Sequence, residues 1–209
     1  MTEKKYICEK CEKNLVMIDE GKCFCCGENT SKNGICESCK KELFFDGFIS
    51  VFEFDKVIQN LIHCYKYEEF KKIGKYLGEI LAEKLSRYSF ISDVDYILPV
   101  PLHHIKKRER GFNQARILGK SVSKKLQIPL KNSAVKRKKY TKSQTKLCKE
   151  EREKNVGNAF VIKDISLVKN KRLLIVDDVF TTGSTMKSIA SVLKNNGAEK
   201  VYASSIVRA

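Results

Sequence analysis

Hydrophobic positions recur along this chain with strand-like and helix-like spacings in alternation. The apolar run FISVFEF at 48–54 predicts a strand, and Asp55 after it is suited to cap a helix over KVIQNLIHCYKY. A second helix is predicted over 73–85, where apolar residues share one face, and both helices are expected to serve the core rather than a site. DYILPVP at 95–101 predicts another strand, and a basic loop then leads to a helix near 113–126.

The last third of the chain has the same alternation with stronger signals. RLLIVDD at 172–178 predicts a buried strand, TTGST a tight loop, MKSIASVLKNN a helix that ends at Gly197, and KVYASSIV at 200–207 another strand. This β-α-β order predicts a parallel sheet with right-handed crossovers. The expected fold class is therefore α/β, a mainly parallel sheet flanked by helices. Residues 131–158 are polar with almost no apolar periodicity, and they predict a long loop or flap.

The first 47 residues have a different composition. They are rich in Cys, Gly and Lys with few long apolar runs, so burial alone cannot give them a core. Six of the nine cysteines form C-x-x-C pairs there, at Cys8/Cys11, Cys23/Cys26 and Cys36/Cys39. We divide the chain into a cysteine-rich module, 1–47, and an α/β domain, 48–209.

Two of these cysteine pairs have the spacing of a structural zinc site. Cys23 and Cys26, followed by glycine, and Cys36 and Cys39 predict two zinc knuckles that supply four thiolates in tetrahedral geometry. A redox dithiol is the less expected alternative, because a thioredoxin-type pair would follow a strand and open a helix. We therefore expect a small zinc-ribbon-like module. The pair Cys8/Cys11 could join Cys23/Cys26, belong to a second incomplete site, or be spare.

The positive charge of the chain is concentrated in one segment. The net charge is +16, and residues 103–154 alone hold 18 basic and 4 acidic residues. Such a segment can bind a phosphodiester backbone through counterion release, with Phe112 or Tyr140 available to stack on bases. It can equally serve a small phosphorylated ligand or form a solvated surface.

The first residues lack the apolar run of a signal peptide, and no stretch approaches the roughly 20 apolar residues of a membrane span. We expect a cytoplasmic protein with reduced thiols.

The sequence LLIVDDVFTTGSTM has the layout of an anion site. Its apolar strand delivers Asp177 and Asp178 to a carboxyl end, and the loop that follows enters a helix. Backbone N–H groups of such a loop face a phosphate, glycine allows close approach, and adjacent carboxylates suit sugar hydroxyls or a hydrated Mg²⁺. A Walker-type site is excluded because its first glycine would fall on Gln114. The loop residues are Thr181, Thr182, Gly183, Ser184 and Thr185.

IVDDVFTTGST at 175–185 resembles the signature of type I phosphoribosyltransferases, which bind 5-phosphoribosyl-1-pyrophosphate (PRPP). Further motifs follow the order of the ComF family: PVPL at 99–102, RGFNQA at 110–115, Gln144 with Leu147, and R-x-x-N-x-x-x-A-F from Arg152 to Phe160. With the cysteine pairs, the chain is similar to that family over essentially its whole length.

The resemblance implies roles for particular residues. Asp177 and Asp178 would hold the ribose hydroxyls, residues 181–185 the 5′-phosphate, and Mg²⁺ would accompany PRPP. The pyrophosphate-side candidates are Val100, Pro101, Leu102, Arg108 and Arg110. Val100 and Leu102 can equally be strand-end packing, whereas arginine offers a bidentate fork to a pyrophosphate.

The resemblance also implies a cellular role, in handling single-stranded DNA in the cytoplasmic step of natural transformation, beside a helicase partner. The candidate DNA contacts are Lys136, Arg137, Lys138, Lys139, Phe112 and Tyr140. The alternative is an active phosphoribosyltransferase that displaces pyrophosphate with a nucleobase or another small acceptor. Thr181 stands where purine-salvage relatives have an acidic residue that handles the base proton, so general acid–base help from that position is missing.

Overall fold

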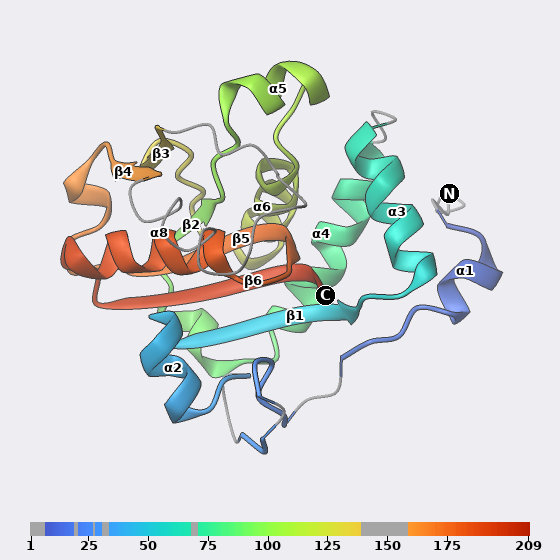
Figure 1. Cartoon of the computed structure of the whole chain (residues 1–209), viewed down its shortest axis with the longest axis horizontal. Coiled ribbons are helices and arrows are strands. Elements are labelled where there is room, and N and C mark those ends of the chain that lie inside the picture. The colour runs from blue at the N-terminus through green and yellow to red at the C-terminus, as the bar shows by residue number, and fades with distance from the viewer. Residues whose placement is uncertain (1–6, 19–20, 27, 31–33, 68–70, 139–158) are drawn as a thin grey trace.

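A four-stranded parallel sheet forms the centre of the computed structural model (Figure 1). The structure describes residues 7–18, 21–26, 28–30, 34–67, 71–138 and 159–209. The strands are β1 (Gly47–Glu53), β2 (Tyr96–Pro99), β5 (Arg172–Phe180) and β6 (Lys200–Arg208), and they lie in the order β1-β6-β5-β2. All three pairings are parallel, which confirms the predicted fold class.

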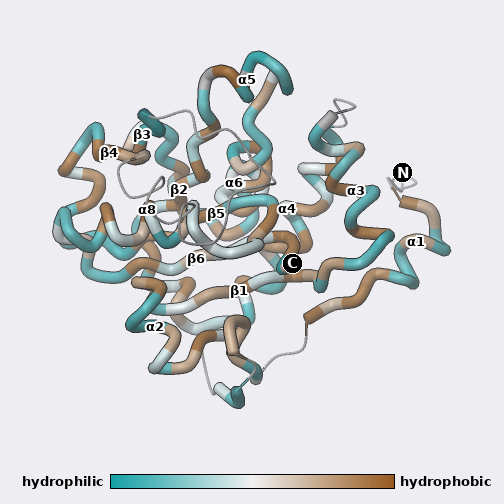
Figure 2. Tube along the Cα trace, in the orientation of Figure 1, coloured by the Kyte–Doolittle hydropathy of each residue, from teal (hydrophilic) through white to brown (hydrophobic). Residues whose placement is uncertain are grey.

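Helices cover both faces of this sheet. On β5, Leu174 and Val176 face the core shared with α3 (Lys56–Tyr67), α4 (Lys71–Leu85) and α6 (Gln114–Leu126). Leu173 and Ile175 face the opposite core, which α8 (Ser184–Asn195) covers. A strand buried on both faces explains the unbroken apolar run that the sequence shows at β5. Hydrophobic positions accordingly run along the central strands, while α5 (His104–Arg110) at the rim is largely hydrophilic (Figure 2).

The residues predicted to start and end two of the helices lie where the sequence places them. The backbone N–H of Ile58 donates to Asp55 Oδ1 at 2.7 Å and caps α3. Gly197, with φ of +83°, follows the end of α8 in the left-handed region. Among the described helices, none is both long and apolar enough to span a membrane.

Two predictions for the middle of the chain are wrong. The basic loop after β2 is the helix α5, in which the His103 side chain accepts the N–H of Ile105 and Gly111 ends the helix with φ of +70°. The polar stretch from 131 does not begin as a loop or flap. It contains β3 (Val135–Arg137), which pairs antiparallel with β4 (Phe160–Ile162). The remainder of the expected flap, 139–158, lies outside the described residues.

The cysteine-rich segment packs directly on the sheet. It contributes α1 (Glu9–Lys13) and α2 (Glu37–Leu43), and 3-10 turns at Ser89–Asp93 and Ile165–Leu167 complete the described elements. The Phe24 ring stacks on Phe48 with centroids 3.8 Å apart and meets Phe180 edge-on at 5.1 Å. The division after residue 47 remains a prediction, and the module it defines shares one core with the sheet.

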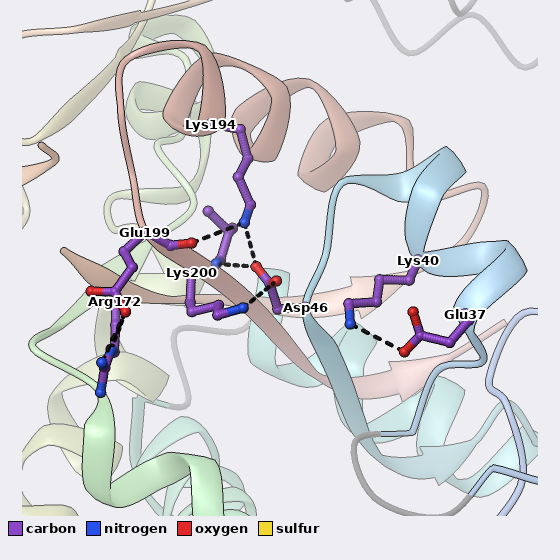
Figure 3. Close-up of polar contacts among 8 residues, drawn as sticks. Glu37, Lys40, Asp46, Arg172, Lys194, Glu199 and Lys200 are labelled. Carbon is purple, nitrogen blue, oxygen red and sulfur yellow. Dashed lines mark hydrogen bonds and ion pairs between the residues drawn. The ribbon is translucent and has the colours of Figure 1, made fainter. Parts of the chain in front are cut away.

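Asp46 joins this segment to the end of the chain (Figure 3). Its carboxylate accepts the backbone N–H of Val201 at 2.8 Å and lies 2.6 Å from Lys194 Nζ and 3.5 Å from Lys200 Nζ. Three donors satisfy this nearly buried carboxylate, so it fixes the entry of β1 against β6 and α8.

Candidate functional site

Three of the predicted motifs meet at the carboxyl edge of β2 and β5. Pro99 lies opposite Val176 in the sheet, and the Val100 N–H donates to the Val176 carbonyl at 2.9 Å. The Asn113 side chain, from the RGFNQA motif, donates to the Val100 carbonyl at 3.0 Å. The PVPL turn is therefore held beside Asp177. In open parallel sheets this edge is where ligands bind.

Two adjacent carboxylates stand at this edge. Asp177 is half-buried and Asp178 is buried. The Asp178 N–H donates to Asp177 Oδ1 and the Val179 N–H to Asp178 Oδ1, each at 2.9 Å. Burial first, and then the charge of Asp178, raise the pKa of Asp177 well above its ordinary range. Cations or hydroxyl donors are therefore needed to keep both groups charged.

Lys66 supplies one such cation from an unexpected element. Its Nζ lies 3.0 Å from Asp178 Oδ2, and both side chains are mostly buried. Lys66 sits in the last turn of α3, a helix that the sequence assigned to the core alone. α3 therefore contributes a cation to the candidate site in addition to its apolar core residues.

More positive side chains lie close to one another next to this ion pair. Burial first, and then the nearby charges of Arg110 and Arg137, lower the pKa of Lys106. Burial also lowers the pKa of Arg137, while the charge of Asp177 opposes that shift. Lys106 and Arg110 come from α5 and Arg137 from β3, so elements distant in sequence form a cluster of cations, and Arg137 lies within reach of the Asp177 charge. Such a cluster suits a ligand with more than one phosphate group.

Gln114 lies buried beside these cations at the start of α6. Its Oε1 accepts from Arg110 Nη1 at 3.4 Å, and its backbone carbonyl accepts from the Tyr65 hydroxyl at 2.7 Å. Its Nε2 has no hydrogen-bond partner among the described residues. A buried donor without an acceptor is costly, so this amide fits a site that receives ligand oxygens. Burial, with Asp178 and Asp177 nearby, raises the pKa of Tyr65, which stays a neutral donor.

The loop after β5 turns tightly into α8. Gly183, with φ of +70°, precedes α8, and a Cβ there would come within 2.4 Å of the Phe180 ring. The Thr182 hydroxyl donates to Ser184 Oγ at 3.2 Å. Thr181 and Thr182 are exposed and Ser184 half-buried. The first N–H groups of a helix lack partners within it, so the start of α8 offers donors to an anion.

The other predicted residues, those on the pyrophosphate side, differ in how far they are exposed. Val100 is buried, so its side chain packs into the core at the end of the strand. Pro101 and Leu102 are half-buried. Arg108 is exposed on α5, whereas Arg110 is half-buried at the site.

The predicted DNA contacts also differ in how far they are exposed. Lys136 and Lys138 are exposed, but Arg137 turns inward. Phe112 is buried against Tyr65, so its ring is not available to stack on a base. That part of the expectation is wrong, because the ring packs in the core against Tyr65 of α3. Lys139 and Tyr140 lie outside the described residues, as do Gln144, Leu147, Arg152 and Asn155.

A separate cluster gathers four cysteine sulfurs. The Sγ atoms of Cys23, Cys26, Cys36 and Cys39 all lie within 4.8 Å of one another, and those of Cys26 and Cys36 are 3.5 Å apart. A tetrahedral ZnS₄ centre needs about 3.8 Å between sulfurs, so these positions fit it. Although burial opposes it, backbone N–H groups that include that of Cys26 lower the pKa of Cys23 to about 7. Cys8 and Cys11 do not belong to this cluster.

Comparison with known proteins identifies the family of this chain. The family described as "Phosphoribosyl transferase domain" matches residues 113–208. Competence protein F of Haemophilus influenzae is 30% identical over 99% of this chain and 92% of its own length. DNA utilization protein YhgH of Escherichia coli is 33% identical over 73% of this chain and 68% of its own. The match to a solved adenine phosphoribosyltransferase from Leishmania donovani covers 76% of this chain and 83% of that chain, at 14% identity and a TM-score of 0.44. The chain therefore belongs to the ComF family and carries a type I phosphoribosyltransferase domain.

Proposed function

We propose that this protein binds PRPP with Mg²⁺ at the carboxyl edge of β2 and β5. The observation that carries the proposal is the meeting of two adjacent, largely buried carboxylates with a cluster of cations and the tight loop that leads into α8. Asp177 and Asp178 would accept hydrogen bonds from the ribose hydroxyls, and residues 181–185 would hold the 5′-phosphate. Mg²⁺ would neutralise the charge of the pyrophosphate when bound.

The pyrophosphate would lie in the other half of the site. The backbone of Val100, Pro101 and Leu102 lines the turn beside Asp177. Arg110 and Lys106 from α5 and Arg137 from β3 provide charge, and Arg108 reaches the same side only from an exposed position. We assign the strongest pyrophosphate contacts to Arg110 and Arg137, because guanidinium groups bind phosphate oxygens in pairs.

Calorimetric titration of PRPP with Mg²⁺ tests the site. The wild-type protein should show saturable binding. Asp177→Asn with Asp178→Asn should weaken it at least about 100-fold, because the charged acceptors of both ribose hydroxyls are removed. Glu79→Gln with Glu83→Gln, two acidic residues on the exposed side of α4, is the matched control and should bind as wild type. Equal binding by the aspartate variant would refute the assignment.

We further propose that the four-cysteine cluster holds a structural Zn²⁺. The support is four thiols at tetrahedral spacing, two of them buried. Metal analysis of freshly purified reduced protein should find zinc, and Cys36→Ser with Cys39→Ser should lose it. Iron–sulfur absorbance would exclude this metal.

The cellular role that we propose is the handling of single-stranded DNA in a cytoplasmic step of natural transformation, beside a helicase. Two relatives are named for competence and for DNA utilization, and Lys136 and Lys138 are exposed within the basic segment. Lys139 and Tyr140, which follow in the sequence, lie outside the described residues. Because β3 also carries the inward-facing Arg137, DNA and PRPP would bind to opposite sides of one strand.

Charge reversal separates the two ligands. Lys136→Glu with Lys138→Glu should weaken single-stranded DNA binding and lower its salt dependence, by roughly 0.7 in log–log slope for each phosphate that the variant no longer neutralises. PRPP affinity should stay unchanged. Arg137→Ala should have the opposite effect and weaken PRPP binding. Filter binding over a salt series provides the measurement, and an unchanged salt slope would remove this surface from the DNA role.

The alternative activity is transfer of the phosphoribosyl group to a small acceptor. A screen of purines, pyrimidines, amines and DNA for pyrophosphate release distinguishes it from binding alone. With Thr181 in place of an acidic residue, we expect no turnover on nucleobases above the rate without protein. Release that depends on Asp177 would establish an enzyme.

A further inference from the structure

Cys8 and Cys11 form a thiol pair apart from the four-cysteine cluster. Cys8 immediately precedes α1 and is exposed, and Cys11 is half-buried. In Figure 1, α1 lies at one edge of the molecule beyond α3, whereas α2, which contains Cys39, lies below the far end of β1. Neither sulfur belongs to the four-sulfur group.

The turn around Cys8 repeats the local geometry of Cys36. Cys8 is the N-cap residue of α1, with φ of −69° and ψ of 154°, and Cys36 is the N-cap residue of α2, with φ of −78° and ψ of 163°. In both turns the N–H group four residues further along donates to the carbonyl of that cysteine at 3.0 Å. The second cysteine of each pair, Cys11 or Cys39, lies in the first turn of its helix. One of these turns belongs to a four-thiol cluster, and the other presents half of such a set.

The missing half cannot come from the described part of this chain. Within it, groups of three or more candidate ligands occur only at Cys23, Cys26, Cys36 and Cys39. A second copy related by a two-fold axis would bring an identical pair and complete four thiolates.

The surface around the pair permits such an approach. The charges on α1 balance, with two glutamates and two lysines, although the whole chain carries +16. Val16 and Met17 nearby are 50% and 49% exposed, and Met17 borders a groove of about 300 Å³ between this segment and α4. The hydrophobic stretch after α1 is visible in Figure 2. A second copy would cover apolar surface that is otherwise exposed.

We propose that Cys8 and Cys11 hold one Zn²⁺ ion together with the same two residues of a second copy of this chain, which makes the α1 edge a metal-dependent dimer contact.

Zinc content and molecular mass, measured together on the full chain, test the proposal. With zinc present, the wild type should be a dimer with about 1.5 zinc ions per chain, one in each four-cysteine cluster and one shared. Cys8→Ser with Cys11→Ser should be a monomer with about one. Retention of that zinc and an unchanged circular dichroism spectrum would show that the variant folds. The matched control, Cys25→Ser with Cys64→Ser, should behave as wild type.

A second variant blocks the contact without touching a thiol. Val16→Glu with Met17→Glu should also reduce the mass by half and remove the shared zinc. A wild-type monomer with about two zinc ions per chain would overturn the proposal, because the pair would then bind metal alone. A Cys8–Cys11 disulfide in reduced protein given zinc, or a serine variant with unchanged mass and zinc, would also overturn it.

Discussion

The ion pair between Lys66 and Asp178 places a positive charge inside the site before any ligand binds. Because both side chains are mostly buried, Lys66→Met leaves a carboxylate without its partner and should lower the free energy of unfolding by about 2 kcal/mol. Adding Asp178→Asn removes that charge and should restore most of the loss. Urea denaturation of the two single variants and the double variant measures the coupling. Additive losses would show that the pair contributes nothing.

Gly183 is required by its backbone and by its neighbour. Gly183→Ala places a Cβ in the left-handed region and against the Phe180 ring, so it should cost about 1–2 kcal/mol and weaken PRPP binding about tenfold. Gly21→Ala is the matched control, because Gly21 also has a positive φ but no atom lies within 4 Å of its Cβ position. Its thermal stability should fall less and its PRPP affinity should not change. Equal effects on PRPP binding would contradict this role of Gly183.

The raised pKa of Asp177 predicts a pH dependence of stability in the ligand-free protein. From the ordinary value of 3.8 up to the raised pKa, the folded state keeps a proton that the unfolded chain releases. Stability from this group therefore falls as pH rises through that range, by up to about 1.4 kcal/mol per pH unit, and then levels off. Over the same range, the free energy of unfolding of the Asp177→Asn variant should rise relative to that of the wild type as the pH rises. A difference that is constant with pH would contradict the raised pKa of Asp177.

At the scale of elements, the long apolar runs were predictable and the short or charged segments were not. β5 and α8 follow from periodicity, because each buries a face that is apolar in the sequence. α5 is seven residues, HIKKRER, with no apolar face, and it forms through the His103 cap and Gly111. β3 and β4 are three residues each and depend on pairing between distant segments.

In the site too, some residues could be predicted from the sequence and others could not. Asp177, Asp178 and the glycine loop are contiguous in sequence, so their chemistry could be inferred. Lys66 lies more than a hundred residues before its partner, and its position in α3 gave no signal of a site. Gln114 lay within a recognised motif, but only the structure shows that its amide is buried and unpaired among the described residues.

The packing of the cysteine module predicts that metal loss affects the sheet. Phe24 contacts Phe48 of β1 and Phe180 of β5, so unfolding the module removes part of one continuous core. Removing zinc by chelation should lower the Tm of the whole protein by at least about 5 °C in a single transition. Calorimetry with and without zinc provides the test. An unchanged main transition after complete metal loss would show that the module is independent.

At the scale of the whole molecule, the two proposed ligands divide the charge of the basic segment. Arg110 and Arg137 turn toward Asp177 and Gln114, while Lys136 and Lys138 face solvent. Among the described residues, the basic segment therefore contributes both an inward-facing cluster and exposed lysines, and the two proposed ligands would use different parts of it.

The position of PRPP in crystals of the protein grown or soaked with PRPP and Mg²⁺ is the decisive measurement. We predict the 5′-phosphate against the backbone of residues 181–185, the ribose hydroxyls on Asp177 and Asp178, and the pyrophosphate between the Val100 turn and Arg110. Gln114 Nε2 should gain an oxygen acceptor from the ligand or from an ordered water. PRPP bound elsewhere, or a carboxyl edge that stays empty at saturating ligand, would refute the proposed site.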